Sequence, residues 1–322
     1  PPSETGGRTG VGPAFEAADV SDDAYPDGQV AVHAIAEMQR LSKQDAPFFL
    51  AVGFVKPHLP FNAPQRYWDL YDRSEIVIPE RDQWPDEAPS FAGTSWGELR
   101  GYAGMPRSGA ASEELATDLI HGYYACVSYT DALVGQVLAE LVRLKLEEET
   151  IVILWGDHGW KLGDYGAWCK HTNFEIDTHV PMILRVPGQT DDGLRTAALV
   201  EFVDIFPTLS DLCGICVPDA CEGASMTPLI DDPAREWKEA AFSQYPRSGK
   251  MGYSIRSGQW RYTEWINRNT GEITDRELYD HSDGPVVERN LAAESQHAAT
   301  IERLSELIDG GQGWKAIREA LH

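Results

Sequence analysis

Apolar residues follow two different periods along the first two thirds of the chain, which predicts alternating helices and strands. Across residues 115–141, leucine, tyrosine and valine recur every three or four positions, the period of a helix that buries one face. Residues 47–55 and 151–155 are short, continuous apolar runs, typical of strands that are buried on both faces. Further strands are expected at 180–186 and 197–202. Strands that alternate with helices indicate an α/β sheet.

The ends of the helical segments carry recognisable signals. Ser112 precedes two glutamates, and an N-cap residue followed by an acidic first turn predicts that the long helix begins there. The helical period continues to about Leu146, and a shorter helix is expected at 29–41. Residues 1–26 and 79–107 are rich in proline and glycine, so they are expected to be irregular.

The pattern changes after Pro233, where short strands replace the alternation of strands and helices. They are expected at 240–244, 253–257, 259–265 and 277–280, followed by a terminal helical segment. We therefore predict a partial α/β domain over residues 1–235 and a small α+β subdomain with an antiparallel sheet over residues 236–322.

The charge of the chain is strongly negative. It contains 51 acidic and 27 basic residues, a net charge of −24. Nucleic acid is excluded as a partner, because its recognition requires a basic surface. No apolar run reaches the length of a membrane span, so no membrane partner is expected, and the first residues show no signal-peptide pattern.

Asp157 and His158 form a candidate metal site. They directly follow the apolar run 151–155, and the carboxyl ends of strands in open α/β sheets are where ligands and metals bind. Aspartate suits a hard divalent cation, and a neutral imidazole is a common second ligand. Lys170 and His171 add positive charge that could face an anion held by the metal. The alternative is a turn in which the histidine caps backbone groups.

His58 is a second candidate for chemistry. It lies between two prolines just after the apolar run 47–55, and Lys56 precedes it by two residues. An imidazole held rigidly at the end of a strand suits a proton donor or an anion ligand. The alternative is an incidental histidine in a surface turn.

Three cysteines, Cys213, Cys216 and Cys221, lie close together in the sequence. No fourth ligand follows at the spacing of a zinc site. A disulfide bond between Cys216 and Cys221 and three free thiols both remain open.

Together these motifs resemble the sulfatase family of the alkaline-phosphatase-like superfamily, and within it the iduronate-2-sulfatase branch. The matching segments are 47–61, 156–170, 173–175, 178–188, 203–209, 243–247, 251–256 and 277–280. The resemblance implies an alkaline-phosphatase-like fold, in which helices cover both faces of a mixed sheet, with part of that sheet missing here. It also implies a sulfuric ester hydrolase that acts on sulfated sugars, and a periplasmic or secreted location.

The resemblance assigns roles to individual residues. Asp157 and His158 match metal ligands of the family, which usually bind Ca²⁺, with Mg²⁺ as an alternative. His58 matches the histidine that contacts the sulfate ester and protonates the leaving alkoxide, and Lys170 matches the lysine that holds a sulfate oxygen.

Three further residues are assigned to substrate binding. Trp160 and His171 fall where the branch lines its sugar pocket. Lys56 is assigned either to an acidic sugar or to a structural role.

One departure from the family pattern is serious. The family makes its formylglycine nucleophile in a Cys/Ser-x-Pro-Ser-Arg motif, and this sequence contains none. The chain resembles the C-terminal two thirds of a sulfatase, so we expect the nucleophile to lie outside it and the chain alone to be inactive. The alternatives are a phosphate or phosphonate ester hydrolase of the same superfamily, and a non-catalytic fragment or binding module.

Overall fold

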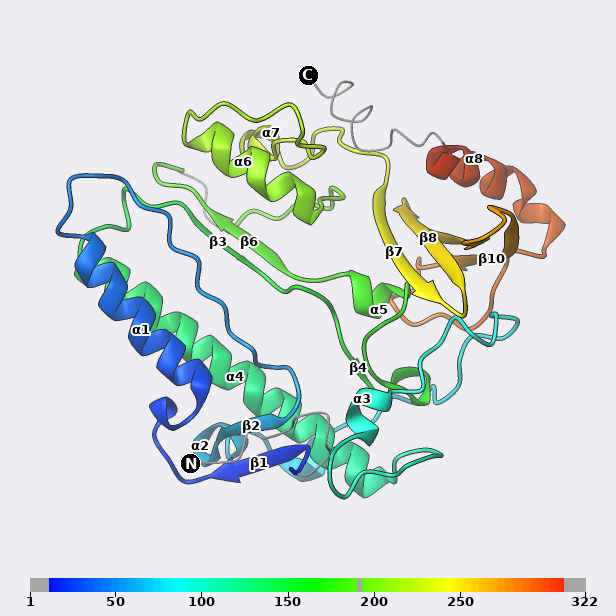
Figure 1. The fold of residues 1–322 in the computed structure, drawn as a ribbon, viewed down its shortest axis with the longest axis horizontal. Coiled ribbons are helices and arrows are strands. Elements are labelled where there is room, and N and C mark those ends of the chain that lie inside the picture. Colours follow the sequence, from blue (N-terminus) through cyan, green and yellow to red (C-terminus); the bar gives the residue numbers. More distant parts are fainter. Residues whose placement is uncertain (1–11, 190–192, 310–322) are drawn as a thin grey trace. The chain divides into compact units, whose positions relative to one another are not determined.

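The computed structural model describes residues 12–189 and 193–309, which form two compact units (Figure 1). The first unit contains the described residues up to Gln83, together with Ser95–Lys170 and Val180–Gln189. The second contains Trp84–Thr94, His171–His179 and the described residues from 193 onward. The boundary that the sequence predicts at residue 235 does not coincide with the division between these two units. It stays a prediction.

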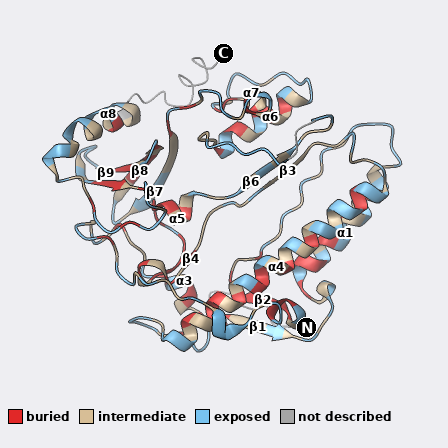
Figure 2. Ribbon diagram, turned by 180° about the vertical axis from the view of Figure 1, so that it is seen from behind, coloured by how far each residue is buried: buried red, intermediate tan, exposed pale blue. Residues whose placement is uncertain are grey.

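Two helices form the main packed core of the first unit. The long helix α4 (Glu113–Arg143) begins where the sequence predicts, because the side chain of Ser112 accepts a hydrogen bond from the amide of Leu115. Its partner α1 (Pro26–Leu41) begins three residues earlier than expected, with a proline at its first position. The two helices pack along their lengths, and Figure 2 shows buried positions recurring along both.

Short elements surround this helix pair. A two-stranded parallel sheet of β1 (Phe15–Ala18) and β2 (Phe61–Pro64) packs on α4. The other short elements are η1 (Asp22–Ala24), α2 (Gln65–Trp68), η2 (Arg73–Glu75), α3 (Gly97–Arg100), β4 (Lys161–Leu162), η3 (Asp164–Gly166) and β5 (Trp168–Cys169).

The predicted buried strands of this unit are only partly present. Strand β3 (Val152–Trp155) pairs antiparallel with β6 (Met182–Arg185), and no third described strand joins them. Residues 47–55 form no strand, and Phe49 is 82% exposed. A strand that is apolar on both faces needs neighbours, and the described residues provide none. The prediction of a buried strand here is therefore wrong, as is the strand predicted at 197–202.

Helix α4 is also the one described helix that is long and apolar enough to cross a membrane. This criterion uses length and composition alone, and long core helices of other proteins meet it too. Because α4 packs against α1 and β2, the match is weak evidence for a membrane span.

The second unit is built on the antiparallel sheet that the sequence predicts. Its strands are β7 (Ala241–Arg247), β8 (Lys250–Ser257), β9 (Trp260–Asn267) and β10 (Ile273–Asp280), in the order β10-β9-β8-β7. Helix α8 (Ala298–Asp309) covers one face, where Leu304 packs with Ile255, Tyr262 and Leu278. Each of these large side chains contributes about 1.5–3 kcal/mol by leaving water.

A buried lysine holds the rest of this unit to the sheet. The ammonium of Lys238 lies 2.7 Å from Glu201 and 2.5 Å from Asp204, and Glu201 also accepts a hydrogen bond from the amide of Phe242 in β7. The helical elements here are α5 (Glu175–Thr178), η4 (Phe202–Asp204), α6 (Ile205–Leu212), α7 (Thr227–Asp231) and η5 (Ser295–His297). All five cysteines lie in described residues and none of them forms a disulfide bond.

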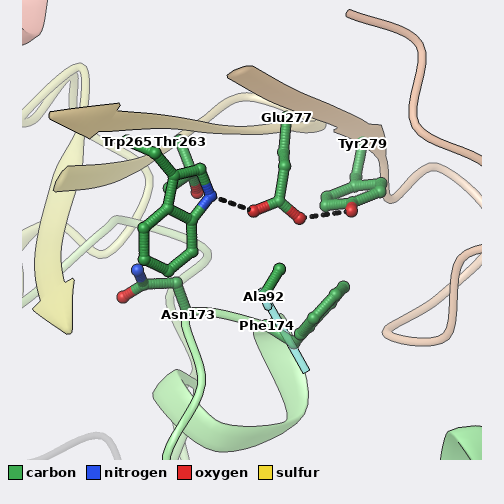
Figure 3. A pocket seen from close by; sticks show the side chains of 7 residues that line it. All are labelled: Ala92, Asn173, Phe174, Thr263, Trp265, Glu277 and Tyr279. Atoms are coloured by element: carbon green, nitrogen blue, oxygen red, sulfur yellow. Dashed lines mark hydrogen bonds between the residues drawn. The ribbon is translucent and has the colours of Figure 1, made fainter. Parts of the chain in front are cut away.

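One carboxyl group of the sheet, that of Glu277 in β10, is buried. Glu277 accepts hydrogen bonds from the indole of Trp265 and the hydroxyl of Tyr279, each at 2.5 Å (Figure 3). The small pocket beside it, lined also by Asn173 and Phe174, has no room for a water molecule. Burial raises the pKa of Glu277 to about 7, although the two hydrogen bonds act in the opposite direction.

This burial predicts a pH-dependent stability. Between the ordinary pKa of 4.5 and about 7, folded Glu277 keeps a proton that the unfolded chain has lost, so the free energy of unfolding falls as the pH rises. Glu277→Gln should reduce this fall by roughly 1–3 kcal/mol. Urea unfolding at pH 5 and pH 8 measures it, with the exposed Glu236→Gln as the control. Equal pH dependence in wild type and Glu277→Gln would contradict the assignment.

Candidate active site

Asp157 and His158 lie side by side at the end of β3. The pairing of β3 with β6 continues for one residue beyond Trp155, where the amide of Gly156 donates to the carbonyl of Pro181. The Asp157 side chain is 85% exposed, and one of its oxygens accepts a hydrogen bond from the amide of His158. Its other oxygen lies 3.6 Å from Nε2 of His158.

The hydrogen bond on the far side of the imidazole decides which nitrogen can bind a metal. Nδ1 of His158 lies 2.9 Å from the carbonyl oxygen of Gly159, which can only accept, so Nδ1 carries the proton. In the neutral ring Nε2 then presents its lone pair beside the carboxylate, the arrangement usual for metal-binding histidines. These residues fit a divalent cation as two of its ligands. The described residues bring no third histidine, cysteine or carboxylate to the pair.

Lys170 follows a tight hairpin formed by β4 and β5. The register pairs Lys161 with Cys169, and the turn between them includes Gly166. Gly166 has a φ of +63°, and an added Cβ would lie 2.3 Å from the carbonyl oxygen of Asp82, so only glycine fits. Both neighbours of Lys170, Cys169 and His171, also adopt positive φ values, +68° and +80°. Such strain costs on the order of 1–3 kcal/mol per residue and is typical of functional sites.

His58 lies on a loop that α1 anchors. The carboxylate of Asp27 accepts hydrogen bonds from the amides of Val55 and Lys56, at 3.0 and 2.7 Å. The peptide bonds before Pro57 and Pro60 are both cis. Nδ1 of His58 lies 2.7 Å from the carbonyl oxygen of Leu59, which leaves Nε2 as the reactive nitrogen.

His58 and Lys170 meet, although 112 residues separate them in the chain. The ammonium of Lys170 lies 2.5 Å from Nε2 of His58. Glu98, on α3, joins both: its carboxylate lies 2.9 Å from Nε2 of His58 and 3.1 Å from the ammonium of Lys170. Partial burial raises the pKa of Glu98, but the hydrogen bonds and charges of the two partners outweigh it and lower the pKa to about 2.

Trp160 connects the metal-ligand pair with this cluster. Its ring stacks on His158 with centroids 6.1 Å apart and meets His58 edge-on at 5.3 Å. The ammonium of Lys170 lies 4.7 Å from the centroid of the same ring, a cation–π contact. The indole Nε1 is buried and has no hydrogen-bond partner within the described residues.

The structure places the last two predicted site residues differently. Lys56 is 5% exposed, and its ammonium lies 3.5 Å from the carbonyl oxygen of His58, a contact that suits the structural role. His171 belongs to the second unit, where its ring stacks on Tyr245 and its carbonyl oxygen accepts a hydrogen bond from Arg247. The roles of both residues in substrate binding stay predictions.

Sequence reasoning missed Glu98. It lies in the segment 79–107, where proline and glycine predict only irregular structure, and no metal or phosphate motif surrounds it. The one local signal is a glutamate in the first turn of a four-residue helix, between the buried Trp96 and Leu99. Such a signal is too common to point to a site.

Comparison with known proteins identifies the family. The family model "Sulfatase" matches residues 6–215, and the model "N-sulphoglucosamine sulphohydrolase, C-terminal" matches residues 163–312. The chain belongs to the sulfatase family. It is 31% identical to iduronate 2-sulfatase of Mus musculus over 90% of this chain. The match covers the C-terminal part of that relative, 66% of its length, so the chain spans just under two thirds of it.

Solved structures confirm the predicted α/β fold of the alkaline-phosphatase-like kind. One is a protein in complex with its substrate D-glucosamine-2-N,6-O-disulfate, with a TM-score of 0.77 and 20% identity, covering 91% of this chain and 70% of that one. Another is the phosphonate monoester hydrolase of Agrobacterium radiobacter, with a TM-score of 0.77 and 24% identity, covering 93% and 63%. Similarity at these identities establishes the fold alone.

The close approach of Gly166 to Asp82, in the hairpin that precedes Lys170, predicts that replacing this glycine destabilises the protein. Gly166→Ala combines a left-handed backbone with a clash against Asp82, so it should destabilise the protein by roughly 2–4 kcal/mol in urea unfolding. Gly109→Ala is the matched control, because Gly109 has a φ of +75° but open space around it. It should cost only about 1 kcal/mol. Equal costs for the two variants would refute the close approach at Gly166.

Proposed function

We propose that this chain supplies the sulfate-holding and leaving-group side of a metal-dependent sulfatase site that acts on sulfated sugars. The observation that carries the proposal is the meeting of Lys170 and His58 in a member of the sulfatase family. An ammonium donor and an imidazole nitrogen at one point suit the oxygens of a sulfate ester.

The chemistry of sulfate esters explains the need for both side chains. The ester is an anion, and charge grows on its oxygens as the S–O bond breaks, so a fixed cation there stabilises the transition state. Lys170 supplies that charge from a side chain that is 11% exposed, between two residues with positive φ values. A sugar alkoxide is a poor leaving group, and we assign its protonation to Nε2 of His58, the ring nitrogen that does not contact the carbonyl oxygen of Leu59.

The metal and the nucleophile complete the proposal. Asp157 and His158 would hold the cation, Ca²⁺ in the first instance and Mg²⁺ as the alternative, and when bound it supplies Lewis-acid stabilisation of the sulfate oxygens. The nucleophile is a formylglycine that lies outside these 322 residues, since they contain no motif for it. The 322-residue chain alone is therefore inactive.

The substrate class rests on two relatives. One is named iduronate 2-sulfatase, and the other binds a disulfated glucosamine as its substrate. Trp160 offers a partly exposed aromatic ring beside the cluster, a feature that suits a sugar ring. A periplasmic or secreted location, where sulfated polysaccharides occur, is part of the same proposal.

A second candidate is a phosphonate monoester hydrolase, because one such enzyme shares the fold with a TM-score of 0.77. A direct comparison of the whole protein on a sulfated disaccharide and on phenyl methylphosphonate, a phosphonate monoester, decides between them. The sulfatase proposal expects at least tenfold higher kcat/KM on the sulfate, and the reverse ratio would favour the second candidate.

The catalytic assignments predict large effects in the whole protein that contains this chain. His58→Ala should lower kcat on a sugar sulfate about 10²–10⁴-fold, because the leaving alkoxide loses its proton donor. Lys170→Ala should lower it about 10²–10³-fold, because a charge that stabilises the transition state is lost. Sulfate release measures both, with the exposed His33→Ala and Lys43→Ala as controls. If His58→Ala or Lys170→Ala turned over substrate at a near-normal rate, the catalytic role assigned to that residue would be wrong.

The metal assignment has a test that needs no activity. Tb³⁺, a substitute for Ca²⁺, should show luminescence on excitation of Trp155 or Trp160, which flank Asp157 in the sequence. Asp157→Asn should weaken Tb³⁺ binding at least tenfold, since one of two described ligands loses its charge. The exposed Asp131→Asn is the control. Unchanged binding in Asp157→Asn would show that the ion binds elsewhere.

A further inference from the structure

Glu98 stands out because it is the one carboxylate that contacts either Lys170 or His58 among the described residues. Its Oε1 lies 2.9 Å from Nε2 of His58 and 3.2 Å from the ammonium of Lys170, and its Oε2 lies 3.1 Å from that ammonium. The side chain of Glu98 is 27% exposed, whereas that of Lys170 is 11% exposed. The three residues come from segments far apart in the sequence. None of the roles considered so far requires a carboxylate at this point.

Counting donors and acceptors shows what the carboxylate does. Nδ1 of His58 is committed to the carbonyl oxygen of Leu59, so the proton that His58 would give to a leaving group sits on Nε2. An ammonium group has three donors and no acceptor, so Lys170 can bond to an unprotonated Nε2 but repels a protonated one. Glu98 accepts from the ammonium of Lys170, and it accepts from Nε2 of His58 when that nitrogen is protonated, so that its negative charge then offsets the two positive ones.

The backbone around Glu98 is built to hold it in place. The guanidinium of Arg100 donates to the carbonyl oxygens of Ser95 and Pro106, at 3.0 and 2.8 Å, and its carbon lies 3.2 Å from the centroid of the Trp96 ring. Leu99, the next residue along the helix, is buried. A helix of one turn would otherwise be mobile, so these contacts fix the position of the carboxylate.

We propose that Glu98 is a positioning residue that keeps the proton-bearing Nε2 of His58 beside the ammonium of Lys170, both facing the sulfate ester. The proposal rests on the proposed function and deepens it. Glu98 itself does not touch the substrate: it acts through His58, whose proton matters only when the leaving oxygen is a poor leaving group. The low pKa of Glu98 agrees, because the carboxylate stays ionised at neutral pH.

Leaving-group dependence tests this role in the whole protein. Glu98→Gln should lower kcat on a sugar sulfate about 10–100-fold, because protonation of the alkoxide is impaired. On 4-nitrophenyl sulfate, whose leaving group needs little protonation, the loss should stay below about threefold. Glu98→Asp should recover part of the lost rate, and the exposed Glu75→Gln should match wild type. Equal losses on both substrates would overturn the proposal in favour of a purely structural role.

A second measurement separates this proposal from the function on which it rests. In the 322-residue chain labelled with ¹⁵N-lysine, the ammonium signal of Lys170, assigned by its absence in Lys170→Met, should be visible at low temperature because Glu98 slows its exchange. In Glu98→Gln the Lys170 signal should broaden beyond detection, while in Glu75→Gln it should remain unchanged. A signal unchanged in Glu98→Gln would refute the contact. If the whole protein cleaves phosphonates and no sulfates, the proposed function fails, while this readout still decides whether Glu98 holds the ammonium of Lys170.

Discussion

A lysine ammonium beside an imidazole needs a counter-charge whenever that imidazole carries a second proton, and the site depends on this constraint. Lys170 and His58 approach to 2.5 Å, and Glu98 lies against both. The surrounding structure follows from the need to bring these three groups together. A hairpin with left-handed residues presents the lysine, a loop anchored by Asp27 presents the imidazole, and a pinned turn of helix presents the carboxylate.

Much of the fold could be predicted because its signals are local. The N-cap at Ser112 and the helical period after it locate α4, and the change of pattern after Pro233 locates the antiparallel sheet. The sequence singles out Asp157, His158, His58 and Lys170 because their motifs are short and typical of the family, and the structure brings His58 and Lys170 together, while their roles stay predictions. Glu98 could not, since its role arises only when three distant segments meet, and no pattern near it encodes that meeting.

The strand predicted at residues 47–55 is absent for a physical reason. A continuous apolar run indicates a strand whose two faces are both buried when the sheet is complete. In the described residues the same segment has no strand beside it, and Phe49 and Val55 are exposed. The pattern therefore describes an environment that these residues do not create by themselves. Trp155 and Ile183, on β3 and β6, are exposed for the same reason.

The open ribbon of β3 and β6 has a consequence for how the chain behaves in solution. In the described residues each of its strands has a neighbour on one edge only, and Trp155 and Ile183 on these strands are exposed, as is Phe49 in the segment 47–55. Such edges recruit strands from other molecules, including copies of the same chain. The purified 322-residue chain will thus associate with copies of itself through backbone pairing, and the more so the higher its concentration.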